Sequence, residues 1–483
     1  MQFAVVQRVL GILLALFSLT LLPPIFIAWW INDASLLAFF YAFCLIVVVG
    51  LLLWLPVKDV RKELRLRDGF VVVVLFWAGL GITGSVPLIL SDVPHLSFTD
   101  AVFESLSGLT TTGATVITGI DNLPLPILFY RQELQWLGGM GIIVLAVAIL
   151  PILGIGGMQL YRAETPGPLK DTKLTPRITE TAKALWYIYL TMTIACALLY
   201  WLAGMSLFDA IAHSFSTVSI GGFSTHDQSI GYFNSRTIDA IAVIFMLLSG
   251  INFTLHFLAW RHASIKPYWF DAELRTYMFI LVSLSIICCL YLIFMGDYED
   301  KSVAITDGIF QTISIATTTG FTTTQYQNWP TFLPVFLLFA SFVGACAGST
   351  GGGLKVIRVL LLSRQGMREI KRLVHPNAVI PIKIGNKPVA ERVINAVWGF
   401  FATYIATFAF LLLALMATGL DQVTAFSAMA ACMNNMGPGL GDVSANYGNI
   451  NDTAKWLLCI AMLLGRLEIF TLLVLLTPTF WRK

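Results

Sequence analysis

Four short apolar segments in this chain share one pattern, and each lies between two longer apolar runs. Each has about a dozen residues of helical pattern, too few to cross a bilayer, which is typical of a re-entrant helix. In each, a glycine follows the first residue by thirteen positions. In register, the segments read DAVFESLSGLTTTGA from Asp100, DAIAHSFSTVSIGGF from Asp209, DGIFQTISIATTTGF from Asp307 and TAFSAMAACMNNMGP from Thr424.

Ten longer runs can each cross the roughly 30 Å of hydrocarbon in a bilayer. Only 12% of the 483 residues are charged and the mean hydropathy is +0.80, so the apolar surface must face lipid. This composition excludes a soluble or disordered protein. The runs lie near 8–31, 35–57, 70–91, 128–155, 181–204, 236–260, 274–296, 331–362, 392–418 and 454–480.

The repeated segments predict the fold class. We expect an all-α polytopic membrane protein in which four pseudo-symmetric units of helix, re-entrant helix and helix surround one ion pore. Amphipathic helices resemble one another by chance, but chance is a poor explanation for four equal offsets to glycine, each between two spans. Two extra N-terminal helices should occupy 1–66, and the four units 67–160, 175–265, 270–375 and 388–483.

Basic residues are concentrated in alternate linkers, within 58–67, 162–183, 261–275 and 364–392. By the positive-inside rule these linkers are cytoplasmic, which puts both termini in the cytoplasm, as an even number of spans requires. The formal net charge is only +3, far too small for a nucleic-acid-binding surface. The lipid bilayer is therefore an expected partner, and nucleic acid is not.

The ends of the four short segments predict the pore itself. Irregular backbone at membrane depth is tolerated where it is buried in protein or lines a water-filled path. Backbone carbonyls can replace the hydration shell of a monovalent cation, and glycine readily takes the positive φ that turns them toward one axis. The predicted pore-lining residues are Thr111, Thr112, Gly113, Ile220, Gly221, Gly222, Thr318, Thr319, Gly320, Asn435, Met436 and Gly437.

Five glycines between Gly344 and Gly353 should break the last apolar run of the third unit. A G-x-x-x-G packing motif is the alternative, but it does not explain three consecutive glycines. A phosphate-binding loop is excluded, because Gly353 is followed by Leu354 and not by Lys-Ser or Lys-Thr. We expect a loop that obstructs the path beneath the pore and can move aside, formed by Gly348, Ser349, Thr350, Gly351, Gly352 and Gly353.

Two basic residues are candidates for control of this path. Arg466 lies near the middle of the last apolar run, where a charge costs at least about 2.5 kcal/mol and usually faces an internal cavity. A structural ion pair with another helix is the alternative role for Arg466. Lys355 follows the glycine-rich loop, although its long stem also allows it to snorkel to the cytoplasmic surface, and Arg131 is expected to snorkel at the outer surface.

These motifs resemble the Trk/Ktr/HKT superfamily of potassium transporters, most closely its bacterial TrkH-type membrane subunits. The resemblance covers the whole chain. It rests on TTTGATV at 110–116, GGFSTHD at 221–227, TTTGFTT at 317–323, NNMGPGLG at 434–441 and the closing GRLEIFTLLVLLTPTFWRK.

The resemblance implies potassium uptake across a bacterial inner membrane, with a selectivity filter at the predicted pore and a gate at the glycine-rich loop and Arg466. It implies a homodimer and a cytosolic ring of RCK-type nucleotide-binding subunits. Potassium is then the ion at the filter. No nucleotide is expected on this chain, because its cytoplasmic linkers are too short for a βαβ domain. Relatives that prefer sodium tend to carry serine where this chain has Gly113.

Two other functions fit the residues less well. A proton- or sodium-coupled potassium symporter would normally place ionisable residues along its path, and the filter segments contain none. An intramembrane hydrolase using Ser349 or Ser107 would lack a G-x-S-x-G motif and would give no reason for four equivalent loops. The sequence therefore predicts a transporter and not an enzyme, with coupled symport as the alternative.

Overall fold

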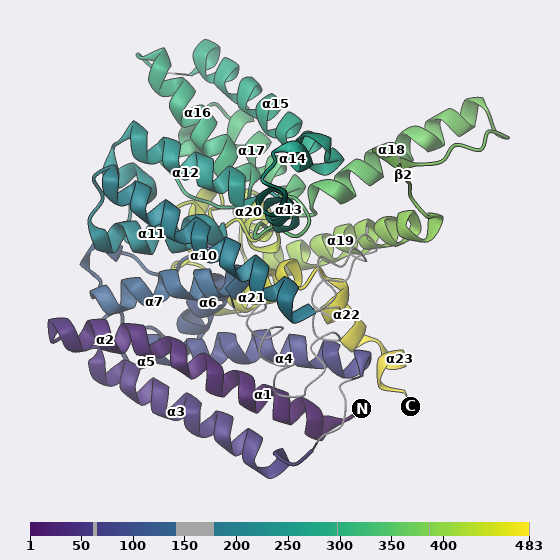
Figure 1. The fold of residues 1–483 in the computed structure, drawn as a ribbon. Helices are drawn as coiled ribbons and strands as arrows, with labels where there is room; N and C mark the ends of the chain where they lie inside the picture. Colours follow the sequence, from purple (N-terminus) through teal and green to yellow (C-terminus); the bar gives the residue numbers. More distant parts are fainter. Residues whose placement is uncertain (61–64, 142–177, 297, 386, 483) are drawn as a thin grey trace.

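The computed structural model describes residues 1–60, 65–141, 178–296, 298–385 and 387–482. Long apolar helices make up most of this part of the chain, and the strands described are limited to one short hairpin. In Figure 1 the N-terminal helices lie along one edge, α15 and α16 lie at the opposite edge, and α20 and α21 lie between them. The last unit therefore returns to the first, and α21 packs against α6.

Two N-terminal spans, the N-terminal pair, precede the repeated units. The first span consists of α1 (Phe3–Ser18) and α2 (Leu22–Ile31), and the second contains α3 (Leu36–Trp54). α1 and α3 cross closely because both carry a glycine at the crossing: a Cβ on Gly11 would lie 2.8 Å from the carbonyl oxygen of Gly50. This close approach holds the pair together by backbone packing, as is common between helices in lipid.

Each repeated unit contains a helix of 12 to 16 residues that ends a few residues before the predicted glycine. The first two units comprise α4 (Leu66–Gly84), α5 (Val86–Leu90), α6 (Phe98–Leu109), α7 (Leu125–Trp136), α10 (Ile178–Leu202), α11 (Leu207–Ser219), α12 (Arg236–Ser249) and α13 (Phe253–His262). The third and fourth comprise α14 (Lys266–Phe270), α15 (Ala272–Met295), α16 (Lys301–Ala316), α17 (Phe332–Val343), α18 (Val356–Val374), β1 (Lys383–Ile384), β2 (Lys387–Pro388), α19 (Glu391–Ala417), α20 (Gln422–Met433), α21 (Asp452–Arg466), α22 (Phe470–Leu476) and α23 (Pro478–Trp481). One π-turn, Leu137–Gly141, extends α7, and single 3-10 turns cover Leu19–Leu21, Leu55–Val57, Ile120–Asn122, Ser229–Phe233, Tyr326–Asn328 and Gly441–Val443.

The four short helices α6, α11, α16 and α20 start in the same way. A side-chain oxygen at each N-cap accepts a hydrogen bond from a backbone N–H of the first turn. The capping residues are Ser97, Ser206, Asp300 and Asp421. Such caps satisfy backbone donors that would otherwise be unpaired at a helix start.

Eight of the ten predicted runs correspond to candidate spans among the described residues, and two of these eight bend sharply. Six helices are long and apolar enough to cross a membrane without a break, counted over the described residues. The predicted run 236–260 bends by 92° between α12 and α13, and 454–480 bends by 116° between α21 and α22. Ser249-Gly250-Ile251-Asn252 stands at the first bend and Arg466-Leu467-Glu468 at the second, but the long apolar stretches on either side predict each run as one span. The predicted break after Gly344 is present.

Part of the predicted organisation lies outside the described residues. This applies to most of the second half of the run 128–155, to the boundary between the units 67–160 and 175–265, and to most of the basic linker 162–183. The described helices agree with the predicted fold class. The prediction of an all-α polytopic membrane protein is therefore confirmed.

Both ends of the chain meet at the start of α4 (Figure 1). The backbone N–H of Gln2 donates to Asp68 Oδ1 at 3.1 Å, and Arg67 Nη1 donates to the carbonyl oxygen of Arg482 at 3.1 Å. The N- and C-termini therefore lie on the same side of the helix bundle.

Candidate ion pathway

The four loops that follow α6, α11, α16 and α20 have the same backbone conformation. In each, the N–H of the residue before the glycine donates to the carbonyl five residues earlier, at 2.8 Å in all four loops. In each, the glycine and the residue two positions before it have positive φ. These pairs are Thr111 (54°) and Gly113 (79°), Ile220 (57°) and Gly222 (81°), Thr318 (69°) and Gly320 (84°), and Asn435 (53°) and Gly437 (95°).

The four glycines form a closed ring. A Cβ added to Gly113, Gly222 or Gly320 would overlap a backbone carbonyl oxygen of the next loop, namely that of Gly221, Thr319 or Met436. A Cβ on Gly437 would lie 2.6 Å from the carbonyl oxygen of Thr112, which returns the contact to the first loop. Each glycine thus lies against the carbonyl of the residue that precedes the next glycine, so the four loops surround one axis.

The side chains around the ring are uncharged and hydrogen-bonded to one another. Thr110 and Thr112 share a 2.7 Å hydroxyl contact in the first loop, and Thr317 and Thr319 share the equivalent contact at 2.8 Å in the third. Asn435 Nδ2 donates to Thr112 Oγ1 at 2.9 Å and so links the fourth loop to the first. A buried ring of carbonyls with no charged side chain of its own is suited to a partly dehydrated monovalent cation.

The glycine-rich segment lies directly against this ring. Gly352 N–H donates to Thr318 Oγ1 at 2.7 Å, and Gly353 N–H donates to the carbonyl oxygen of Asn434 at 3.1 Å. Thr350 Oγ1 donates to the carbonyl oxygen of Val218 at 3.1 Å. The segment therefore contacts three of the four loops or their helices. Gly348, Ser349 and Gly351 belong to the same irregular stretch between α17 and α18.

A buried carboxylate holds the two ends of this segment together. Glu273 Oε1, at the start of α15, accepts hydrogen bonds from Ala347 N–H at 2.7 Å and from Ile357 N–H at 3.2 Å. The bend between α12 and α13 holds the segment from another side, because Phe253 N–H donates to the carbonyl oxygen of Gly348 at 3.0 Å. Sequence reasoning missed Glu273, and its only signal was a carboxylate at the edge of an apolar run.

Arg466 lies at the end of α21, between the ring and the glycine-rich segment. Its Nη1 donates to Thr111 Oγ1 at 3.2 Å and to the carbonyl oxygen of Thr350 at 3.3 Å. Its Nη2 donates to the carbonyls of Gly138 and Gly139, the latter at 2.8 Å. Arg466 therefore bridges a predicted filter residue and the predicted gate.

The other charges near this point have distinct partners. Lys355 Nζ donates to the carbonyl oxygen of Gly351, so this ammonium points back into the glycine-rich segment. Glu468, two residues after Arg466, forms an ion pair with Arg358 on α18. That pair joins the bend between α21 and α22 to the helix that follows the glycine-rich segment.

The expectation that Arg131 snorkels to the outer surface is wrong. Its side chain is 1% exposed and forms an ion pair with Glu104 of α6, whose side chain is also 1% exposed. Sequence reasoning also missed Gln135 of α7, which accepts from Phe223 N–H at 3.0 Å and donates to the carbonyl oxygen of Gly221. Opposite charges in two neighbouring apolar segments of one unit were the available signal for the Glu104–Arg131 pair.

A histidine joins the loops of the first two units. His226 Nδ1 lies 2.6 Å from Asp121 Oδ1, and His226 Nε2 lies 3.5 Å from Asp209 Oδ1. Partial burial lowers the pKa of His226, but its contacts with Asp209 and Asp121 outweigh burial and raise the pKa above its ordinary value of 6.5. The imidazole ring also stacks on Tyr232, with ring centroids 3.5 Å apart.

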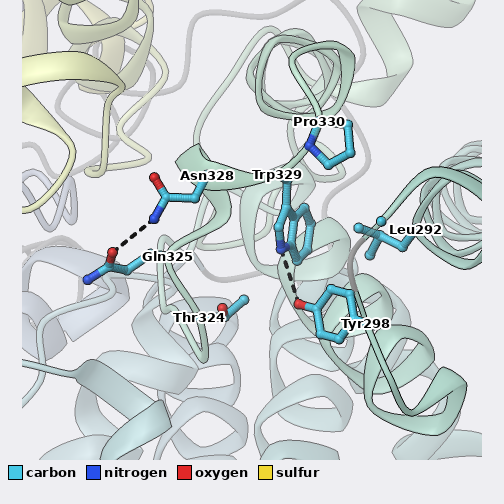
Figure 2. A pocket seen from close by; sticks show the side chains of 8 residues that line it. Leu292, Tyr298, Thr324, Gln325, Asn328, Trp329 and Pro330 are labelled. Carbon is cyan, nitrogen blue, oxygen red and sulfur yellow. Dashed lines mark hydrogen bonds between the residues drawn. The ribbon is translucent and has the colours of Figure 1, made fainter.

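An open pocket of about 450 Å³ lies in the third unit, between the end of α15 and the loop before α17. Figure 2 shows Trp329 donating to the hydroxyl of Tyr298, a contact of 3.1 Å, and Asn328 donating to Gln325, also at 3.1 Å. Thr324 lines the pocket and lies four residues after Gly320. None of the predicted pore or gate residues lines this pocket, so it is separate from the ring.

Comparison with known proteins identifies relatives along the whole chain. The family model TrkH, described as a cation transport protein, matches residues 35–483. A Vibrio parahaemolyticus protein named Trk system potassium uptake protein TrkH is 59% identical, and its Escherichia coli namesake is 56% identical, each over 100% of both chains. The crystal structure of the potassium transporter TrkH from Vibrio parahaemolyticus superposes with a TM-score of 0.91 at 56% identity, and the match covers 100% of both chains.

Proposed function

Because the chain belongs to the TrkH family of cation transport proteins, we propose that it takes up potassium through the ring of four loops. The observation that carries this proposal is the closed set of contacts from each filter glycine to a carbonyl of the next loop. Relatives named for potassium uptake support potassium as the transported ion. Such a ring gives the protein a path for an ion and no chemistry for an enzyme.

The twelve predicted pore residues act as the selectivity filter in this proposal. Positive φ at alternate positions of every loop brings successive carbonyls to the same side of the backbone, which lets several of them face one axis. Potassium is the ion held there. Thr112, Thr319, Gly221 and Met436 supply the carbonyls that lie against the glycines, so a side chain at any of these glycines would displace an ion ligand.

The glycine-rich segment acts as the gate. Its contacts with Thr318 and Asn434 support a closed position directly beneath the filter, and Glu273 and Arg466 hold it there. Lys355 adds a positive charge to the same segment. When the gate opens, these hydrogen bonds must break, so residues 348–353 leave the path only if the freed backbone groups find water or other partners.

The protein is a multi-pass membrane protein, and the bacterial inner membrane is its proposed location, with both termini in the cytoplasm. The name Trk system supports the presence of further components. We infer a homodimer and a cytosolic RCK-type subunit that binds the nucleotide. The cytoplasmic end of α18 supports this, since Leu373 and Val374 are exposed there beyond the helix bundle (Figure 1).

Gly113→Ser tests the filter assignment, with Gly119→Ser as the matched control. Both glycines have positive φ, but a Cβ on Gly119 would meet no atom closer than 3.9 Å, whereas one on Gly113 would overlap the Gly221 carbonyl. In liposomes, we expect Gly113→Ser to lower the potassium-to-sodium permeability ratio about tenfold, the factor that corresponds to about 1.4 kcal/mol of lost ion binding when the added Cβ displaces the Gly221 carbonyl. Gly119→Ser should leave the ratio unchanged.

An unchanged ratio in folded Gly113→Ser would remove this glycine from the filter. The same liposomes test coupled symport. A pH gradient or a sodium gradient imposed at zero voltage, without a potassium gradient, should drive no net potassium flux if the path is a pore. Net potassium movement in that condition would instead support a symporter.

A further inference from the structure

A buried ion pair lies behind the first filter loop. Arg131 of α7 and Glu104 of α6 approach to 2.8 Å between Nη2 and Oε1, and to 2.9 Å between Nε and Oε1. Each side chain is 1% exposed. A charge pair so deeply buried is costly to desolvate, and apolar residues of similar size often serve stability equally well. Stability alone therefore does not explain these two residues.

Both members of the pair also bind the exit of the first loop. Glu104 Oε2 accepts from Val116 N–H at 2.9 Å, and the hydroxyl of Thr115 lies 3.0 Å from each carboxylate oxygen. Arg131 Nη2 donates to Thr115 Oγ1 at 3.1 Å. Thr115 and Val116 follow Gly113 by two and three residues, so the pair contacts the backbone immediately outside the filter.

Arg131 extends the network to the second loop. Its Nη1 donates to the carbonyl oxygen of Ser224 at 3.2 Å, and its guanidinium lies 4.3 Å from the centroid of the Phe223 ring. Ser224 follows Gly222 by two residues, as Thr115 follows Gly113. The planar guanidinium thus joins equivalent positions of two adjacent loops, which a flexible ammonium could not do with the same geometry.

The position of Glu104 has a related role in other units. It lies nine residues before the filter glycine, where the other units have His213, Gln311 and Ala428. His213 Nε2 lies 2.9 Å from Ser224 Oγ, and Gln311 Oε1 accepts from Thr323 N–H at 3.4 Å. Three of the four residues at this position thus bind the exit of their own loop, and Glu104 is the one carboxylate among them.

We propose that Glu104 and Arg131 are positioning residues that set ion selectivity by fixing the first filter loop relative to the second. This inference rests on the proposed filter function. The filter ring depends on contact between Gly113 and the Gly221 carbonyl, which belong to these two loops. Charge-assisted hydrogen bonds are shorter and stronger than neutral ones, so the network resists a change in the spacing of the ring.

The experiment measures the potassium-to-sodium permeability ratio in liposomes, which does not depend on how many transporters are active. Glu104→Gln removes the negative charge and places an amide group, a weaker acceptor than the carboxylate, against the N–H of Val116. Thr115→Val removes the hydroxyl that contacts both Glu104 and Arg131, and it leaves the ion pair itself intact. We expect each to lower the ratio about fivefold, the factor that corresponds to one lost hydrogen bond. Arg368→Met is the control, because Arg368 is also buried and ion-paired, with Glu391, but lies on α18, outside the four loops. Its ratio should match that of the wild type.

The double variant E104M/R131M separates positioning from stability. Removing both charges leaves no unpaired buried charge, so its thermal stability should lie near that of the wild type. It has also lost the hydrogen bonds that Glu104 and Arg131 make to Thr115, Val116 and Ser224, so its permeability ratio should stay low. A double variant with both wild-type stability and a wild-type ratio would overturn the proposal. If the double variant does not fold, Thr115→Val decides, and an unchanged ratio there overturns the proposal.

Gly113→Ser distinguishes failure of this inference from failure of the filter assignment. If Gly113→Ser lowers the ratio while Glu104→Gln and Thr115→Val do not, the filter assignment stands and the positioning role is wrong. If Gly113→Ser also leaves the ratio unchanged, the filter assignment itself fails.

Discussion

Arg466→Ala should raise resting potassium flux through the protein. If the ring is the filter and residues 348–353 are the gate, Arg466 lies on the ion path, because its guanidinium contacts Thr111 at 3.2 Å and Thr350 at 3.3 Å. At an effective dielectric near 20, a cation about 8 Å from this charge is repelled by about 2 kcal/mol. Removing a barrier of that size would speed passage roughly thirtyfold.

The same residue also holds the gate in place. Four oxygen atoms accept from Arg466, on Thr111, Gly138, Gly139 and Thr350, and the alanine variant frees all of them. Lysine separates the two effects, because it keeps the charge but loses the planar fork that reaches several carbonyls. We expect the flux of Arg466→Lys to lie between those of the wild type and Arg466→Ala.

Flux is measured as potassium uptake by liposomes at fixed voltage, normalised to folded protein. Arg8→Ala is a suitable control, because Arg8 Nη1 also donates to a backbone carbonyl, that of Val60 at 2.5 Å, in the N-terminal pair outside the ring. If Lys matches the wild type, the hydrogen bonds do not hold the gate. If Lys matches Ala, the charge is not a barrier, and a folded Ala variant with unchanged flux would refute both roles.

Other expected outcomes test the proposed gate and His226. Shortening residues 348–353 should raise resting flux in the same assay, and reduced or unchanged flux in a folded deletion would support a packing role. Glu273→Gln should raise resting flux about fivefold, because the amide is a weaker acceptor for the N–H groups of Ala347 and Ile357. The raised pKa of His226 means that its stabilising contribution is present below pH 6.5 and is lost as the pH rises through the raised value. Between pH 6 and pH 9 the melting temperature of the wild type should therefore fall more than that of His226→Gln, by a difference on the order of 1 °C, and equal falls would contradict the assignment.

Much of the candidate site could be predicted because it follows from local chemistry. The thirteen-residue offset from the first residue of each short segment to its glycine is a short-range property of the sequence. The requirement of positive φ at that glycine is short-range as well. The five glycines from Gly344 onward likewise predicted a break in a helix, because glycine is a poor helix former whatever its surroundings. These residues could be named without knowing which segments are neighbours.

The contacts of the charged residues could not be predicted in this way. Arg131 lies close in sequence to an outer loop, which favoured snorkelling, yet it pairs with Glu104, 27 residues earlier, and reaches Ser224, 93 residues later. Glu273 binds backbone groups 74 and 84 residues away. The bends at 92° and 116° were also missed, because a glycine, an asparagine or a charge within an apolar run does not by itself say how sharply the helix turns there.

The sequence by itself thus determined the membrane location, the fourfold repeat and the backbone of the four loops, because hydropathy, helix capping and glycine conformation act over a few residues. The tertiary structure alone decided which loop lies against which, and where each buried charge finds its partner. The physical reason is that a buried charge or a close carbonyl contact is stabilised by whichever group the packing brings near it, and that group lies tens to hundreds of residues away in this chain.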